Sequence, residues 1–334
     1  MGAMMRPKTR EENMRHPRRA MLAALLCAPA VATAQDWPNR PIRLVVSFPP
    51  GGSTDVLGRL VAPHIERALG QTVVVENRGG ANGAVASAAV AGANPDGYTF
   101  LLDSGGAITN AFLMRGLGFD YATAFAPVTQ LTLLPSVLMV KAGSPHDTLQ
   151  KLVAHLRANP GKESYGSSGI GTGSHLSGAL LMRRAALDAQ HVPYRGGAQQ
   201  MASLLAGETM FTFSTLAVPA PLIADRQVVA IAASSATRIP GFENVPTVAE
   251  SGYPGFEMVD MHGISAPMGT PHAAIRRVAE AAQAAMADPG LRSRFQALGL
   301  VPHAEGPEAF ATYLATQRER MGAFIRSEGI MAEG

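Results

Sequence analysis

The sequence is poor in cysteine, tryptophan and charge. It has one cysteine and one tryptophan in 334 residues, and charged residues make up 16% of the chain. No apolar run approaches a membrane span: the run over residues 20–34 has 15 residues, whereas a transmembrane helix needs about 20. The one cysteine, Cys27, lies inside this run and follows a leucine instead of a small residue. We therefore interpret it as a small apolar residue of the run and not as a lipoprotein anchor.

The N-terminal segment predicts an export signal. Arg18 and Arg19 precede the apolar run, which ends in Ala-Thr-Ala before Gln35, an order typical of a cleavable secretory signal peptide. The arginine pair leaves both general and twin-arginine export open. We therefore expect residues 1–34 to be removed by cleavage near Ala34/Gln35, and the mature protein to be periplasmic, with neither a disulfide nor a thiol nucleophile.

Removal of this segment changes the charge balance. Residues 1–34 hold six basic and two acidic side chains, which leaves 22 basic and 23 acidic side chains in the mature chain. The formal net charge of +3 thus becomes −1, and nucleic-acid binding has no electrostatic support. The length predicts about two domains, at roughly 150 residues each.

The segment over residues 42–55 predicts a strand, a glycine turn and a helix. Ile42 to Phe48 is rich in β-branched residues and reads as a buried strand. Pro-Pro-Gly-Gly follows, and an amphipathic pattern opens at Ser53 or Thr54. This order aims free backbone N–H groups and the positive end of a helix dipole at one place, where an anion can bind. Any strand–helix connection needs a turn, so one such loop also fits a purely structural cap.

A second glycine-rich loop occurs at residues 166–176, with the sequence GSSGIGTGSHL. Four glycines and four hydroxyl residues at the mouth of a helix predict a second anion-binding nest. The loop lacks the Gly-Lys-Ser/Thr of a P-loop and the acidic residue of a dinucleotide fingerprint. It is not a nucleophile elbow, because Ile170 stands where that motif needs its last glycine.

The alternation of predicted strands and helices favours an α/β fold with a parallel sheet covered on both faces. An apolar stretch leads into a second domain near Lys141, and a later strand returns to the first. The predicted strands lie at 42–48, 71–76, 98–102, 125–141, 164–165, 228–233 and 259–266. The predicted helices begin near 53 and 174 and cover 84–93, 148–158, 198–206, 271–287 and 307–328.

Several multi-residue segments between Trp37 and Ile330 carry a family resemblance: WPNRPIRLVVSFPPGGSTD, VVVENRGGANGAVA, NPDGYTFLL, YGSSGIGTGSHL, VPYRGG, VPTVAESGYPGFE and GISAPMGTP. With these motifs the chain resembles the Bug (TctC-like) family of periplasmic solute-binding proteins of tripartite tricarboxylate transporters. The resemblance implies a two-lobed, type II-like periplasmic-binding-protein fold, the Venus flytrap. We place lobe 1 at residues 35–140 and 259–334, and lobe 2 at residues 141–258.

The resemblance further implies a small carboxylate ligand, held between the lobes by backbone amides, hydroxyls and waters. It implies no cofactor, no metal, no nucleic acid and no catalysis. The implied partners are the permease subunits of a tripartite tricarboxylate transporter or a sensor kinase, and a monomer is expected. The implied ligand contacts are Phe48, Gly52, Thr54, Asp55, Ser104, Ser168, Thr172, Ser174, His175, Gly196 and Ser214.

Two departures from the family pattern leave the identity of the ligand open. The family often has Asp where this chain has Ser214, and Trp in the segment where it has Met261 and His262. The absence of the acid at position 214 bears most on any ligand with an amine. Arg195 fits either a bidentate carboxylate clamp or a solvated side chain.

An exported α/β serine hydrolase is the alternative function, with a nucleophile from the second loop. No base–orienter pair is identifiable near Ser167, Ser168 or Ser174, which disfavours it. His175 lies just inside a helix start, a position more typical of a structural hydrogen bond than of acid–base chemistry. The histidines show no HExxH or paired metal spacing, so the sequence predicts no metal site.

Overall fold

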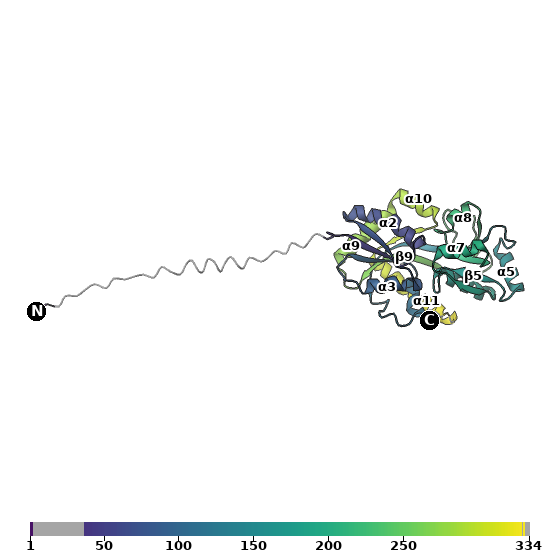
Figure 1. The fold of residues 1–334 in the computed structure, drawn as a ribbon, viewed down its shortest axis with the longest axis horizontal. Helices are drawn as coiled ribbons and strands as arrows, with labels where there is room; N and C mark the ends of the chain where they lie inside the picture. The colour runs from purple at the N-terminus through teal and green to yellow at the C-terminus, as the bar shows by residue number, and fades with distance from the viewer. Residues whose placement is uncertain (3–36, 329, 331–334) are drawn as a thin grey trace.

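The computed structural model describes residues 1–2, 37–328 and 330 (Figure 1). Residues 3–34 of the predicted signal peptide, and its cleavage point, lie outside these residues. Within the described part of the chain, none of the helices has the length and apolarity needed to cross a bilayer.

A mixed sheet of ten strands runs through the molecule in the order β2-β1-β3-β9-β4-β7-β5-β6, and β10 and β8 also pair with β4. β1 is parallel to β2 and β3, as the strand–helix–strand pattern predicts, and β9 then joins β3 in the antiparallel sense. The strands are β1 (Ile42–Val46), β2 (Val73–Asn77), β3 (Thr99–Asp103), β4 (Phe125–Lys141), β5 (Ser164–Ser167), β6 (Gln190–Pro193), β7 (Phe211–Thr215), β8 (Val228–Ala233), β9 (Val259–Pro267) and β10 (Val301–Glu305).

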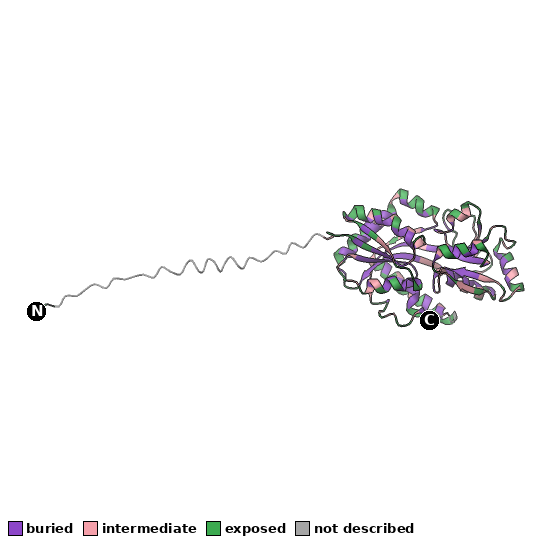
Figure 2. Ribbon diagram, in the orientation of Figure 1, coloured by how far each residue is buried: buried purple, intermediate pink, exposed green. Residues whose placement is uncertain are grey.

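Helices cover both faces of each half of this sheet. They are α2 (Ser53–Leu69), the 3₁₀ turn η2 (Ala81–Gly83), α3 (Ala84–Ala91), α4 (Gly106–Leu113), α5 (Leu149–Ala158), α6 (Gly173–Ala185), α7 (Gly197–Ala206), α8 (Ala220–Ala224), α9 (His272–Ala287), α10 (Pro289–Ala297) and α11 (Pro307–Glu328). In Figure 1, α2, α9 and α10 lie on one side of the first half of the sheet, and α3 and α11 lie on the other. Figure 2 shows the strands mostly buried and the outer faces of the helices exposed.

Strand β1 shows how the sequence pattern builds these layers. Ile42, Leu44 and Val46 are buried in the cluster beneath α2 and α9, whereas Val45 points into the cluster on the opposite face. Side chains of a strand alternate between the faces of its sheet, so a run with apolar residues on both faces must be covered on both. The predicted three-layer arrangement is therefore present in the first half of the sheet.

Strand β4 joins the two halves of the molecule. Its residues 125–135 pair with β9, and its residues 136–141 pair with β7 and β8. Leu138 and Val140 enter one apolar cluster while Val137 and Met139 enter another, so the far half of the sheet is also covered on both faces. β4 thus carries the chain into the second half, and β9, which pairs with β3 and with residues 125–135 of β4, lies in the first half.

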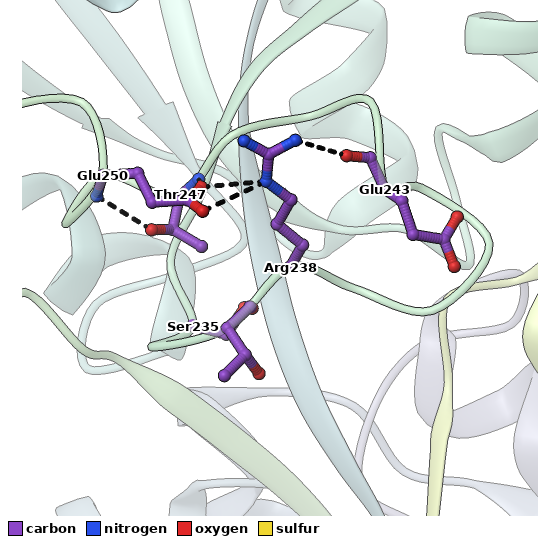
Figure 3. A network of polar contacts seen from close by, with 6 residues as sticks. Ser235, Arg238, Glu243, Thr247 and Glu250 are labelled. Atoms are coloured by element: carbon purple, nitrogen blue, oxygen red, sulfur yellow. Dashed lines mark hydrogen bonds and ion pairs between the residues drawn. The ribbon is translucent and has the colours of Figure 1, made fainter.

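A polar network fixes the long connection between β8 and β9 (Figure 3). The backbone N–H of Thr247 donates to the carboxylate of Glu250 at 2.7 Å, and the N–H of Glu250 donates to the Thr247 hydroxyl at 3.0 Å. Such reciprocal bonds are those of a capping box. Arg238 binds the same carboxylate at 3.0 Å and the backbone oxygen of Glu243 at 2.8 Å. The VPTVAESG motif thus has a structural role in this loop.

The predicted elements agree with the structure except at short segments. β4 and α11 have the predicted bounds, while β1 ends two residues before Phe48. The short elements α4, β6, α8, α10 and β10 were not predicted. In α10 the helix begins at Pro289, with the side chain of Asp288 accepting from the N–H of Leu291 at 2.9 Å. This is an ordinary helix cap. It was not predicted because an Asp-Pro-Gly sequence is equally typical of a turn.

Candidate functional site: a cavity between the two halves

A cavity of about 250 Å³ lies where loops of the two halves of the molecule meet. Nine of the predicted contacts line it: Phe48, Gly52, Thr54, Ser104, Ser168, Thr172, Ser174, Gly196 and Ser214. Asp55 and His175 do not line it. Residues that the sequence did not single out as contacts complete the wall, among them Pro49, Ser53, Leu134, Gly197, Gln200, Thr215, Val218 and Asp260.

The N-terminus of α2 opens onto this cavity. Gly52 is its N-cap residue, and no side chain of the described residues caps the helix. The first hydrogen bond of α2 runs from the N–H of Val56 to the oxygen of Gly52 at 2.9 Å, so the N–H groups of its first turn have no intrahelical partner. With Ser53 and Thr54 in the wall, these donors can meet an anion.

Asp55 lies behind this loop and holds its shape. One carboxylate oxygen accepts from the N–H of Gly51 at 2.9 Å. The other accepts from the side-chain amide of Asn77 at 2.9 Å and forms an ion pair with Arg59. Burial alone would raise the pKa of Asp55, but these bonds outweigh it and lower the pKa. An ionised Asp55 therefore stabilises the loop that presents α2.

The second glycine-rich loop is largely saturated by its own hydrogen bonds. The N–H of Ser168 donates to the Ser174 hydroxyl at 3.0 Å, and the N–H of Gly171 donates to Nδ1 of His175 at 3.1 Å. The Thr172 hydroxyl donates to the oxygen of Gly169 at 2.7 Å and lies 2.9 Å from the Ser174 hydroxyl. This loop therefore presents hydroxyl groups to the cavity more than the free N–H groups that the sequence predicted.

His175 is part of an aromatic stack beneath that loop. Its ring lies 4.0 Å from that of His191 at 12°, and His191 in turn stacks on Tyr165 at 5.0 Å. Burial lowers the pKa of His175 to about 4. Burial, together with the neighbouring His175, lowers the pKa of His191 to about 3. Both rings are neutral at physiological pH, which supports the structural role predicted for His175.

The N-terminus of α7 is a feature that sequence reasoning did not single out. Gly196 is its N-cap residue at φ 118°, a backbone conformation that favours glycine, and no side chain of the described residues caps this helix. Gly196, Gly197 and Gln200 line the cavity. The signal was the Arg-Gly-Gly sequence, in which a helix start lacks the usual Ser, Thr, Asn or Asp cap. Two uncapped helix N-termini, those of α2 and α7, thus open onto one cavity.

Asp260 is the second feature that the sequence reasoning missed. It stands near the start of β9, opposite Leu134 of β4, and is the only acidic residue among the described residues of the wall. Burial, added to by the charge of Asp103, raises the pKa of Asp260 to about 7. Burial likewise raises the pKa of Asp103 to about 6. The signal was an acid between the apolar residues Val259 and Met261, near the start of the predicted strand.

The arrangement suits binding more than covalent chemistry or metal binding. Among the described residues, no three His, Cys, Asp or Glu side chains gather as metal ligands would. The nearest approach to a nucleophile–base pair is Ser167 with His191, at 2.6 Å between Oγ and Nε2. Ser167 is fully buried and is not part of the cavity wall, so a substrate in the cavity would not reach its hydroxyl.

The family model of the tripartite tricarboxylate transporter family receptor, TctC, matches residues 57–330. The chain belongs to this family. A relative from Pseudomonas sp. (strain P51), the UPF0065 protein in the tcbD-tcbE intergenic region, is 35% identical to this receptor over 314 residues, covering 92% of it and 94% of the relative.

Solved structures agree with this assignment. The receptor is similar to Rpa4515 of R. palustris with adipate, at 31% identity and a TM-score of 0.86, covering 89% of this chain and all of that one. It is similar also to the periplasmic binding protein BugD, at 32% identity and a TM-score of 0.84, with the same coverage. The predicted family, the two-lobed α/β fold and the solute-binding function are confirmed, and the serine hydrolase alternative has no support.

Proposed function

We propose that this receptor captures a small carboxylate in the cavity between its lobes and delivers it to the permease of a tripartite tricarboxylate transporter or to a sensor kinase. The observation that carries the proposal is the convergence of the uncapped N-termini of α2 and α7 on one cavity. Helix N-termini attract anions through free N–H groups and the helix dipole. The adipate bound by Rpa4515 is a ligand of this class.

The contacts proposed from the sequence keep their ligand role where they line the cavity. Thr54 and Ser104 come from the first half of the molecule, and Ser168, Thr172 and Ser214 come from the second. Arg195 is the only basic residue among the described residues of the wall, and its side chain is exposed. An exposed guanidinium at the rim suits the first encounter with an anion.

We further propose that residues 35–140 and 259–334 form lobe 1 and residues 141–258 form lobe 2. β4 is the strand that crosses between them, and the chain returns to lobe 1 at the start of β9. A ligand that contacts both α2 and α7 gains all its contacts only when the lobes are together, so it favours closure. We place the mature receptor in the periplasm as a monomer that binds its ligand without a cofactor.

A binding screen tests the proposal. Thermal shift and calorimetry with C3–C6 mono-, di- and tricarboxylates should identify ligands, and a ligand at 100 times its dissociation constant should stabilise the fold by about 2.7 kcal/mol. Mass spectrometry of the recovered ligand should find it unchanged, and small-angle scattering should find a smaller radius of gyration with it. Stabilisation by sugars or nucleotides but by no carboxylate would refute the proposal.

A further inference from the structure

Asp260 puts a carboxylate into a cavity that is otherwise arranged for an anion. Its side chain packs against the first residues of two helices: a Cβ at Gly105 would collide with the carboxylate, and a Cβ at Gly173 would lie 3.0 Å from Oδ2. Gly105 is the N-cap of α4 and Gly173 is the first residue of α6. The two glycines leave the room that the Asp260 carboxylate occupies.

This carboxylate is only partly satisfied by the protein. Oδ1 accepts from the N–H of Met261 at 3.0 Å, and the N–H of Gly173 also favours the ionised form. An ionised carboxylate can accept about four hydrogen bonds. No basic side chain of the described residues offsets the cost of burying it. Asp260 is partly exposed where it lines the cavity, so the remaining acceptor sites are open to a ligand.

The two kinds of ligand contact come from different elements of the wall. Free N–H groups come from the starts of α2 and α7, and these lie together, because Gly196 packs against Pro49. The acceptor is the carboxylate of Asp260 on β9. The N–H of Gly173 at the start of α6 already binds this carboxylate, so that N–H is not free for the anion of a ligand. An anion at Asp260 would meet a buried like charge, whereas a hydrogen-bond donor would meet the partner that Asp260 lacks.

We propose that Asp260 determines the ligand class: the receptor binds a small carboxylate that carries a hydrogen-bond donor, an ammonium or amide group, at its other end. The carboxylate of this ligand lies at α2 and α7, and its donor binds Asp260. This inference rests on the proposed capture of a carboxylate and adds what the second end of the ligand must be. A plain dicarboxylate is disfavoured, because one of its ends would face Asp260.

The pH dependence of ligand binding, set by the ionisation of Asp260, provides a second test of the proposal. The groups that face Asp260 are Asp103 on β3, Tyr313 on α11 and the backbone N–H groups at α6 and β9. Burial raises the pKa of Asp260 to about 7, so it ionises across neutral pH. An ammonium-bearing ligand needs the ionised form and should bind more tightly at pH 8 than at pH 6. A dicarboxylate needs the protonated form and should show the opposite trend.

The experiment compares matched ligands on the full mature receptor by calorimetry. Succinate, glutarate and adipate are each compared with their half-amide and with the ω-amino acid of the same length. We expect at least one donor-bearing compound to bind at least tenfold more tightly than its dicarboxylate at pH 8. The Asp260→Asn variant should lose that preference and bind the dicarboxylate at least tenfold better than the wild type does. Asp147→Asn, on the exposed surface at α5, is the control and should change neither value.

The outcomes separate the two proposals. If a dicarboxylate binds the wild type more tightly than its half-amide and amino acid, and the Asp260→Asn variant keeps that order, this inference is wrong while carboxylate capture stands. If none of the nine compounds binds while another carboxylate of the binding screen does, this inference is wrong and carboxylate capture stands. If no carboxylate of that screen binds either, both proposals fail. Should the variant not fold, the wild-type pH trends decide: a dicarboxylate whose affinity is equal at pH 6 and pH 8 contradicts a donor-specific Asp260.

Discussion

Gly196 faces Pro49 at the wall of the cavity: a Cβ on Gly196 would lie 3.6 Å from Cδ of Pro49. Gly196 begins α7 in the proposed second lobe, and Pro49 follows β1 in the first. This spacing is ordinary van der Waals contact, so a methyl group would fit. An alanine would instead be strained in its backbone, because it does not easily adopt φ 118° and ψ 169°.

We therefore predict that Gly196→Ala weakens ligand binding by tilting the start of α7. Holding alanine in that backbone region costs about 1–3 kcal/mol, and relaxation would turn the N–H groups of α7 away from the ligand. Calorimetry should show at least a tenfold higher dissociation constant. Gly207→Ala, at the other end of α7 with φ 79°, carries a similar strain far from the cavity and should lower stability without changing affinity. Equal affinities of Gly196→Ala and the wild type would contradict this role for α7.

The second prediction separates two serines of α6. The Ser174 hydroxyl accepts from the N–H of Ser168 and contacts the hydroxyls of Ser168 and Thr172, whereas the buried Ser177 hydroxyl has no hydrogen-bond partner in the described structure. Ser174→Ala should lower the free energy of unfolding by about 1–3 kcal/mol and weaken ligand binding. Ser177→Ala should be neutral or stabilising, since it removes an unpaired polar group. Chemical denaturation measures both, and equal losses would show that the loop network is not what stabilises this site.

The third prediction concerns the stacked histidines. The pKa of His191 is about 3 in the folded protein, below the ordinary value of 6.5, so the unfolded chain binds more protons between these values. His191 therefore favours the folded state above pH 6.5, and that stability is lost as the pH falls. From pH 7 to pH 5 the wild type should lose about 1–2 kcal/mol through this residue. His191→Phe keeps a ring between His175 and Tyr165 and should lose correspondingly less. If the stabilities of the two proteins fall in parallel between pH 7 and pH 5, His191 is not the cause of the loss.

The pattern of the sequence predicted the elements that position the site. Ile42, Leu44 and Val46 repeat with a period of two and are buried together beneath α2. β4 was predicted with its full length because apolar residues recur from Phe125 to Val140, with at most two residues of other kinds between them. The start of α2 was predicted from the glycine turn that precedes it. These are local signals, in which the neighbours along the chain decide the structure.

The missed features depend on residues far apart in the sequence. Asp260 meets the starts of α4 and α6 only because β9 pairs with β3 and β4, and an isolated acid in a strand looks the same on a solvent-facing edge. The saturation of the second loop depends on where the Ser174 hydroxyl and the His175 ring turn, which composition does not specify. Ser168, Thr172, Gly173 and Ser174 of that loop line the cavity, but the partners of its N–H groups could not be predicted.

The last prediction tests the ionisation of Asp260 through stability alone. The pKa of Asp260 is raised to about 7 by burial and by Asp103, against an ordinary value of 3.8. The folded protein then holds a proton that the unfolded chain has released, so the wild type loses stability as the pH rises from about 4 to about 7. Asparagine cannot ionise, and Asp260→Asn should gain stability relative to the wild type, by about 2 kcal/mol between pH 5 and pH 8. Asp147→Asn should show no such gain, because Asp147 lies at the surface in an ion pair with Lys151. Thermal unfolding without ligand at pH 5, 6, 7 and 8 measures the trend. A constant difference between Asp260→Asn and the wild type would mean that Asp260 is ionised throughout, as it would be if the cavity held enough water to solvate it.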